Sequence, residues 1–214
     1  MGNSYLDEFQ YDLLSRSVID ISILEPLYTK ILNKESYILS LNDNSQVPFK
    51  NVNTNNITKF HRYYNLMDFG FEEMDVFVST IKKMIFELFG WEHFYLKTWA
   101  NVFRKGDFLG LHKHMGNNGN KIFPYAISGH CVLYSSHPSY TTFLFKKQKN
   151  SVHDSSLREV DIDNVPGEIV LFSSYVEHEF KQWDGDLRIG IAFDINNEPD
   201  ADKKWLSDGQ FRYV

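Results

Sequence analysis

The sequence predicts a mainly β protein with supporting helices on its N-terminal side. Short runs of aromatic and β-branched residues, separated by loops with Gly, Pro, Asn and Asp, recur from about residue 94 to 195, a spacing typical of a sandwich or barrel. Helical periodicity precedes these runs, and this order argues against a βαβ nucleotide-binding fold. We therefore expect a single domain over 1–214, with an N-terminal strand and helices over 1–93, a β-core over 94–195 and a C-terminal extension over 196–214.

The first part of the chain begins with a predicted strand, helix and loop. Isoleucines alternate with polar residues over 17–24, which predicts a strand. Pro26 suits the first turn of a helix that reaches about Asn33. Residues 42–58 are rich in Asn and Ser, a composition typical of a loop.

The clearest helix is predicted over 72–89. Its apolar residues recur at helical spacing, and acidic residues occupy the first turn, where they favour the positive end of the helix dipole. Gly90 is expected to end it. The apolar face of this helix therefore belongs to the core.

The core strands are predicted from short apolar runs in the second half of the chain. These strands are 94–103, 109–114, 128–135, 141–147, 168–173 and 187–194. The single cysteine, Cys131, lies in one of them, where it is expected to be a small buried hydrophobe. With no second cysteine and no signal peptide apparent, we expect a reducing compartment, the cytoplasm.

Charge and motif content exclude several classes of function. The net charge is −6 and Lys and Arg form no long run, which argues against nucleic acid as a partner. Neither a dinucleotide-binding glycine motif nor a phosphate loop is present. No stretch approaches the 18 or so apolar residues of a membrane-spanning helix, so we expect no membrane partner.

Three histidines form a candidate metal site. His112 and His114 are two residues apart on a predicted strand, so their side chains point to the same face and two imidazoles can converge on one ion. Taken alone, the pair also fits a polar strand face with two incidental histidines. His178 follows a strong turn-and-strand signal over 166–172, and it adds a third candidate ligand.

Arg188 opens the next strand, ten residues after His178. A guanidinium at the start of an apolar strand costs free energy unless an acceptor meets it. It is a side chain that extends its charged end to solvent, a structural ion pair, or a pocket cation that binds a dicarboxylate.

At this point the chain resembles the iron(II)- and 2-oxoglutarate-dependent oxygenases, and looks closest to the prolyl-hydroxylase-like branch of bacteria and their phages. The resemblance is carried by three blocks in the right order, 99–114, 128–134 and 166–188. It implies a double-stranded β-helix, a distorted jelly roll whose open end holds the metal.

The resemblance also implies roles for individual residues. His112 matches the first histidine of the family and His178 the distal one, and together they would hold Fe(II). Arg188 matches the basic residue that grips the distal carboxylate of the cosubstrate 2-oxoglutarate. Asn101 and Tyr134 fall where related enzymes place polar partners for that cosubstrate.

Two positions depart from the family pattern. Gly190 stands where some branches have Ser or Thr, so Tyr134 is our choice for the second carboxylate partner. His114 stands at the usual carboxylate ligand. Either it is a true ligand in a three-histidine site, or it points inward without binding, or the site is inactive.

The expected function is an Fe(II)- and 2-oxoglutarate-dependent oxygenase that uses O2, hydroxylates a peptide residue or a small molecule, and releases succinate and CO2. The Gly- and Asn-rich segment 114–127 is predicted to be a lid over the substrate. The alternatives are a cupin-like three-histidine oxygenase that does not use 2-oxoglutarate, and a β-sandwich binding module without enzymatic activity.

Overall fold

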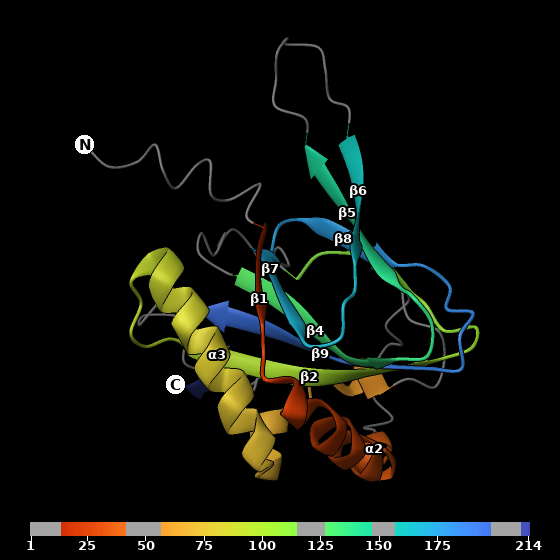
Figure 1. The fold of residues 1–214 in the computed structure, drawn as a ribbon, viewed down its shortest axis with the longest axis horizontal. Coiled ribbons are helices and arrows are strands. Elements are labelled where there is room, and N and C mark those ends of the chain that lie inside the picture. Colours follow the sequence, from red (N-terminus) through yellow and green to blue (C-terminus); the bar gives the residue numbers. More distant parts are fainter. Residues whose placement is uncertain (1–13, 42–56, 115–126, 147–156, 198–210) are drawn as a thin grey trace.

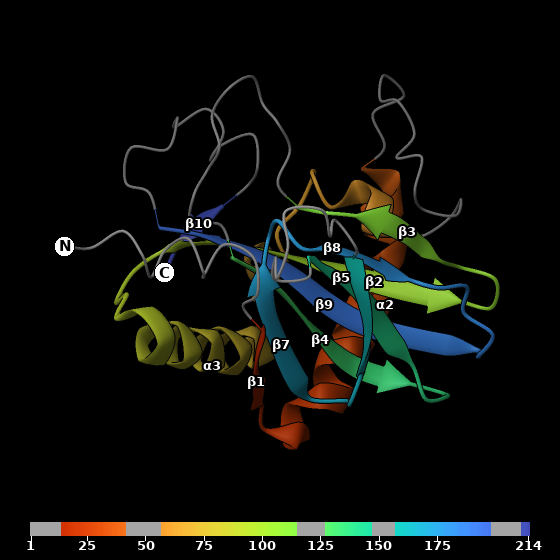
Figure 2. The same cartoon turned by 90° about the horizontal axis from the view of Figure 1, so that it is seen from above.

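Two antiparallel sheets form the body of the protein in the computed structural model, which describes residues 14–41, 57–114, 127–146, 157–197 and 211–214. The larger sheet has the strand order β1-β7-β4-β9-β2-β10 and the smaller sheet has the order β3-β8-β5-β6 (Figures 1 and 2). The strands are β1 (Leu14–Val18), β2 (Tyr95–Arg104), β3 (Leu109–His112), β4 (Ile127–Ser135), β5 (Tyr140–Lys146), β6 (Leu157–Asp163), β7 (Glu168–Ser173), β8 (Glu177–Phe180), β9 (Leu187–Asn196) and β10 (Arg212–Tyr213).

The helices α2 (Leu24–Ser40) and α3 (Glu72–Phe89) lie against the larger sheet on the side away from the smaller one (Figure 1). The short 3-10 turn η1 (Ile21–Ile23) lies between β1 and α2, and the turns η2 (Ile57–Phe60) and η3 (Leu66–Phe69) lie between α2 and α3 along the chain. The prediction of a mainly β fold with N-terminal helices is therefore confirmed. No helix among the described residues is long and apolar enough to cross a membrane.

The N-terminal strand was predicted over the wrong residues. It is β1, which pairs with β7 and ends at Val18, whereas the isoleucine-rich segment after it turns into η1. The Asp20 carboxylate accepts a hydrogen bond from the Ser22 backbone N–H at 2.9 Å, and this local bond favours a helical turn over an extended chain. The helix that follows was correctly placed but continues beyond Asn33 to Ser40.

The second helix agrees with its prediction. It spans Glu72–Phe89 and ends at Gly90, which adopts a positive φ of 69° and donates its N–H to the Phe86 carbonyl at 2.8 Å. Only glycine adopts this left-handed conformation without steric cost, so the sequence signal and the observed helix end have the same cause.

The predicted core strands exist, with one shortened and three missed. β3 ends at His112, so His114 lies just beyond the strand. The sequence did not predict β8, because Glu177 and Glu179 interrupt its apolar residues. It did not predict β6 either, because charged residues recur along that strand. The third strand that was not predicted is the two-residue β10, which falls in the segment predicted as a C-terminal extension. It pairs with the start of β2.

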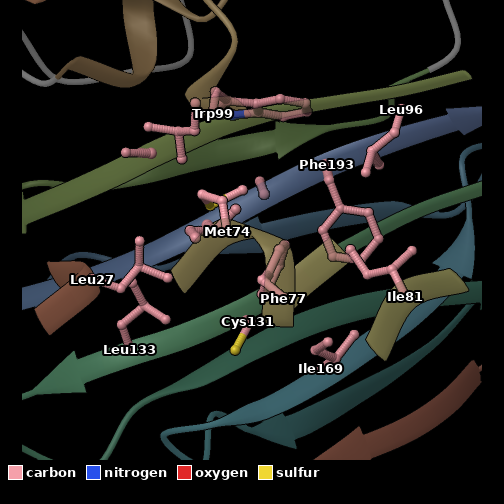
Figure 3. Close-up of a cluster of buried hydrophobic side chains, with 14 of the residues drawn as sticks. Leu27, Met74, Phe77, Ile81, Leu96, Trp99, Cys131, Leu133, Ile169 and Phe193 are labelled. Carbon is pink, nitrogen blue, oxygen red and sulfur yellow. The ribbon is translucent and has the colours of Figure 1, made fainter. Parts of the chain in front are cut away.

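The main core lies between the helices and the larger sheet (Figure 3). Phe193 of β9 meets Phe77 of α3 edge-to-face at 5.8 Å between ring centroids. Gly129 of β4 makes room for it, since a Cβ atom there would stand 2.3 Å from the Phe193 ring. Cys131 is fully buried in this core, as predicted. The other face of the larger sheet is turned to the gap between the two sheets.

Candidate active site

The three predicted histidines come together between the sheets. His112 at the end of β3 pairs across the strands with His178 on β8, and His114 lies two residues after His112. The ring centroids are 4.3 Å apart for His112 and His178, 5.4 Å for His112 and His114, and 5.1 Å for His114 and His178. One nitrogen from each ring lies within 4.8 Å of the others, a spacing that suits one metal ion.

Each of these imidazoles is oriented through its Nδ1 atom. The Nδ1 of His112 lies 2.8 Å from the Gly110 carbonyl, and that of His178 lies 3.0 Å from the Val176 carbonyl. Both acceptors require an N–H on Nδ1, so the tautomer leaves each Nε2 with a free lone pair. This is the state in which a histidine binds a metal.

His114 is oriented differently, by a carboxylate. Its Nδ1 lies 2.6 Å from Oδ1 of Asp194, on β9. The Ser128 hydroxyl donates to the same oxygen at 2.7 Å, and Ser174 contacts Ser128 at 2.6 Å between hydroxyl oxygens. The backbone N–H of His114 also donates to the Ser174 carbonyl at 3.2 Å. His114 is thus fixed at its main chain and at its ring.

Burial sets the protonation of the cluster. It lowers the pKa of His112 to about 4 and that of His178 well below its ordinary value, and the neighbouring imidazoles add to both shifts. Burial acts to raise the pKa of Asp194, but His114, Ser128 and Lys97 outweigh it and the pKa falls below its ordinary value. His112 and His178 are therefore neutral, and Asp194 is a carboxylate, at neutral pH.

Aromatic side chains form the walls around the histidines. Phe172 meets the His178 ring edge-to-face at 4.7 Å, and Phe143 stacks on the same ring at 5.5 Å. Trp99 lies 5.5 Å from the His114 ring. These walls keep the imidazoles in place and reduce the access of water.

The opposite end of the same pocket holds Arg188. Its side chain is buried, its guanidinium lies 4.3 Å above the Phe180 ring, and its Nε donates to the Ser139 hydroxyl at 3.3 Å. Burial lowers the pKa of Arg188 to about 9. Among the described residues, no carboxylate lies within 4 Å of it. A buried cation in that situation is suited to an anionic ligand.

Asn101 lines the pocket between these two ends. Its side-chain oxygen accepts a hydrogen bond from the Thr58 hydroxyl at 2.8 Å, and its residue is 8% exposed. The amide nitrogen of Asn101 remains a possible donor to a ligand.

Tyr134 does not line the pocket, contrary to the prediction. Its ring contacts Tyr28 of α2 at 5.3 Å, on the helix side of the larger sheet. The cause is an irregularity in β4 between Val132 and Tyr134, which adds one residue and reverses the alternation of side chains beyond it. Counting in twos from Ser128 therefore gives the wrong face for Tyr134.

Several pocket residues escaped the sequence-based prediction. Asp194 could have been found, because it lies six residues after Arg188 on one strand and so shares its face. His130 of β4 also lines the pocket, with its Nε2 3.1 Å from Asn164 Oδ1. The residues that line the pocket are Thr58, His61, Arg62, Trp99, Asn101, Phe103, Leu109, His112, Lys113, His114, Gly129, His130, Thr141, Phe172, His178, Glu179, Phe180, Arg188, Ala192 and Asp194.

The predicted lid, 114–127, lies almost wholly outside the described residues, because only His114 and Ile127 of that segment are described.

The same part of the chain matches a protein family. Residues 97–194 match the family model described as "Putative 2OG-Fe(II) oxygenase". This segment begins in β2 and ends at Asp194, so it includes all three histidines and Arg188. No curated protein sequence matches the chain.

Solved structures share the fold. A prolyl-4-hydroxylase from Pseudomonas putida superposes with a TM-score of 0.56 at 12% identity, over 90% of this chain and 97% of that one. A prolyl hydroxylase from Trichoplax adhaerens, in complex with a hypoxia inducible factor peptide fragment, gives 0.58 at 15% identity over 89% and 86%. The viral collagen prolyl hydroxylase of Paramecium Bursaria Chlorella virus-1, as its 2-oxoglutarate complex, gives 0.57 at 8% identity over 87% and 97%.

Proposed function

We propose that the pocket is the active site of an iron(II)- and 2-oxoglutarate-dependent oxygenase, the family to which the β-core of this chain belongs. One observation carries the assignment of roles. Three imidazoles converge at one end of the pocket, and a buried guanidinium without a carboxylate partner among the described residues lies at the other end. A metal and a dicarboxylate would each find a complementary site.

His112, His114 and His178 would hold the iron. The donor set fits, because imidazole nitrogen is a good ligand for iron and all three rings are held in place before metal binding. With three protein ligands, positions remain open for 2-oxoglutarate and O2. When bound, iron and 2-oxoglutarate supply the oxidising chemistry that hydroxylates the substrate and releases succinate and CO2.

Arg188 would bind the distal carboxylate of 2-oxoglutarate. Its guanidinium lies over Phe180, which is two residues from His178 on β8, so the backbones of Phe180 and His178 are about 6.8 Å apart along the strand. A five-carbon diacid can bridge that distance. Thr141 lines the pocket, and we propose its hydroxyl in place of Tyr134 as the second partner of the carboxylate, to which its proton would turn from the Asn164 side-chain oxygen 3.1 Å away.

The primary substrate would enter the same pocket, whose lining also includes His61, Arg62 and Lys113. We propose a peptide residue or a small molecule, because the net charge of −6 is unfavourable for a long polyanion. We also propose the cytoplasm as its location, since the single cysteine is a buried free thiol.

The main alternative is a cupin-like three-histidine oxygenase that does not use 2-oxoglutarate. It accounts for His114 but gives Arg188 no ligand. A binding module without activity accounts for neither the anchored imidazoles nor the buried cation. Release of succinate from 2-oxoglutarate would exclude the cupin-like oxygenase. Stoichiometric metal in a chelator-free preparation would argue against the binding module.

The decisive experiment pairs two arginine variants. We expect Arg188→Met to raise the KM for 2-oxoglutarate by about tenfold or more, because a charged hydrogen bond to a buried carboxylate contributes about 1.5–3 kcal/mol. Arg104→Met is the matched control, since Arg104 pairs with Glu35 on the surface at 2.7 Å. Equal KM values for the two variants would refute the role of Arg188. A crystal soaked anaerobically with Mn²⁺ and 2-oxoglutarate would show both ligands directly.

A further inference from the structure

We propose that Asp194 is a positioning residue for the metal centre, which acts through His114 and supplies from behind the imidazole the negative charge that a carboxylate ligand would otherwise bring. The inference rests on the proposed metal role of the three histidines, and it is independent of the cosubstrate. The short contact of 2.6 Å between His114 Nδ1 and Asp194 Oδ1 is its starting point.

The hydrogen bond fixes both the tautomer and the direction of the His114 ring. A carboxylate is only an acceptor, so the proton of the neutral ring lies on Nδ1 and the lone pair on Nε2. A carboxylate acceptor also makes the imidazole a stronger donor to a metal than a backbone carbonyl does. His112 and His178 have backbone carbonyls as partners, so His114 alone of the three is coupled to a charge.

Asp194 is itself held by the sheet. Ser128 and Lys97 lie directly opposite it on the neighbouring strands, so the three side chains share one face of β4, β9 and β2. The Ser128 hydroxyl donates its only proton to Asp194, so Ser174 must donate to Ser128. Lys97 is 5% exposed and brings a positive charge beside the carboxylate. This row prevents Asp194 from turning away from His114.

The charge of the centre follows from this arrangement. Fe²⁺, the 2-oxoglutarate dianion and three neutral imidazoles sum to zero. Counted without Lys97, an ionised Asp194 brings the total to −1, which equals the total for two histidines and one carboxylate ligand. Asp194 therefore restores, behind His114, the negative charge that the histidine removes from the ligand position, and Lys97 beside it balances part of that charge.

The test is a double-mutant cycle on Co²⁺ affinity, measured by competition with a chelator on the full chain and independently of turnover. We expect Asp194→Ala to weaken Co²⁺ binding about 10–100-fold. Asp194→Asn should weaken it less, because the amide oxygen still accepts from Nδ1. In a His114→Ala background, Asp194→Ala should cost no more than about twofold further, because its effect passes through His114.

The matched control is Asp161→Asn on β6, where the carboxylate accepts from the Thr142 hydroxyl at 2.7 Å. Thr142 pairs with Asp161, whereas the next residue, Phe143, pairs with His178, so Asp161 and His178 belong to opposite faces of the smaller sheet. The control substitution should leave Co²⁺ affinity unchanged. The melting temperature of each metal-free variant identifies a variant that fails to fold, and Asp194→Asn then decides the result.

Two results would overturn the inference while leaving the proposed function intact. In one, the unmodified protein binds Co²⁺ and His114→Ala weakens the binding, but neither Asp194→Ala nor Asp194→Asn changes the Co²⁺ affinity. In the other, Asp194→Ala costs as much without His114 as with it, which would make Asp194 an independent ligand. If the unmodified protein binds no Co²⁺, the proposed function and the inference both fail.

Discussion

The two faces of the six-stranded sheet are built from the same strands, but one face packs in the apolar core and the other lines the pocket. On β9, Ile189, Ile191 and Phe193 face the helices and are fully buried in the apolar core, whereas Arg188 and Asp194 face the gap between the sheets. Alternation along one strand thus places stabilising side chains on one face and the two functional side chains on the other. Substitutions on the helix side should affect stability, and substitutions on the pocket side should affect chemistry.

The largest effect is expected on the pocket side, at His178. His178→Gln should abolish turnover of 2-oxoglutarate and weaken Co²⁺ binding at least about 100-fold, because loss of a ligand costs more than loss of the partner of a ligand. The free energy of unfolding of the metal-free protein should change by no more than about 2 kcal/mol. Chelator competition and urea unfolding measure the two quantities, and a large loss of both would blur the distinction between the faces.

The corresponding change on the helix side is Phe193→Ala. It removes a fully buried ring that packs on Phe77, and we expect the free energy of unfolding to fall by about 3–5 kcal/mol. At a temperature where the variant is folded, its Co²⁺ affinity should stay within a few-fold of the original. Urea unfolding checks the first value. A selective loss of metal binding without loss of stability would contradict the division of roles.

A smaller effect is expected from pH, again on the pocket side. Burial, followed by the charge of Arg188, lowers the pKa of His130 to about 3, whereas an unfolded histidine titrates near 6.5. Between these values the unfolded state binds more protons, so stability rises with pH and is lost as pH falls below about 6.5. We expect His130 to account for about 1–2 kcal/mol between pH 7 and pH 5.

The variant His130→Gln tests this assignment, because it keeps a donor for Asn164 and removes the titrating group. Urea unfolding of the metal-free variant at pH 7 and pH 5 should show a weaker pH dependence than the unmodified protein. An unchanged dependence would assign the effect to other groups.

The smallest effect is expected at Tyr134. Because its ring contacts Tyr28 on the helix side, Tyr134→Phe should leave the KM for 2-oxoglutarate within about twofold of the original. Steady-state succinate release measures it. A clear rise in KM would mean that the hydroxyl reaches the pocket, and the face assigned to β4 beyond Val132 would be wrong.

Much of the site was predictable because strand alternation and short-range spacing are local properties. The pair His112 and His114 shares a side of the chain through its two-residue spacing. His178 was found from a turn-and-strand signal, and Arg188 from the cost of a charge in an apolar strand. Tyr134, which was chosen from the resemblance, lies on the helix side for an equally local reason, since one extra residue in β4 reverses the parity and no composition signal marks it.

The sequence by itself determined the class of the fold, the helix over 72–89, the strand runs of the core and the identity of the candidate ligands, because these depend on periodicity and side-chain chemistry. Tertiary structure alone decided which distant strands became neighbours. Pairing of β3 with β8 joins His112 to His178, and pairing of β9 with β4 places Asp194 beside Ser128. Such register depends on the summed packing of both sheets, so the contact between Asp194 and His114 became visible only in the folded molecule.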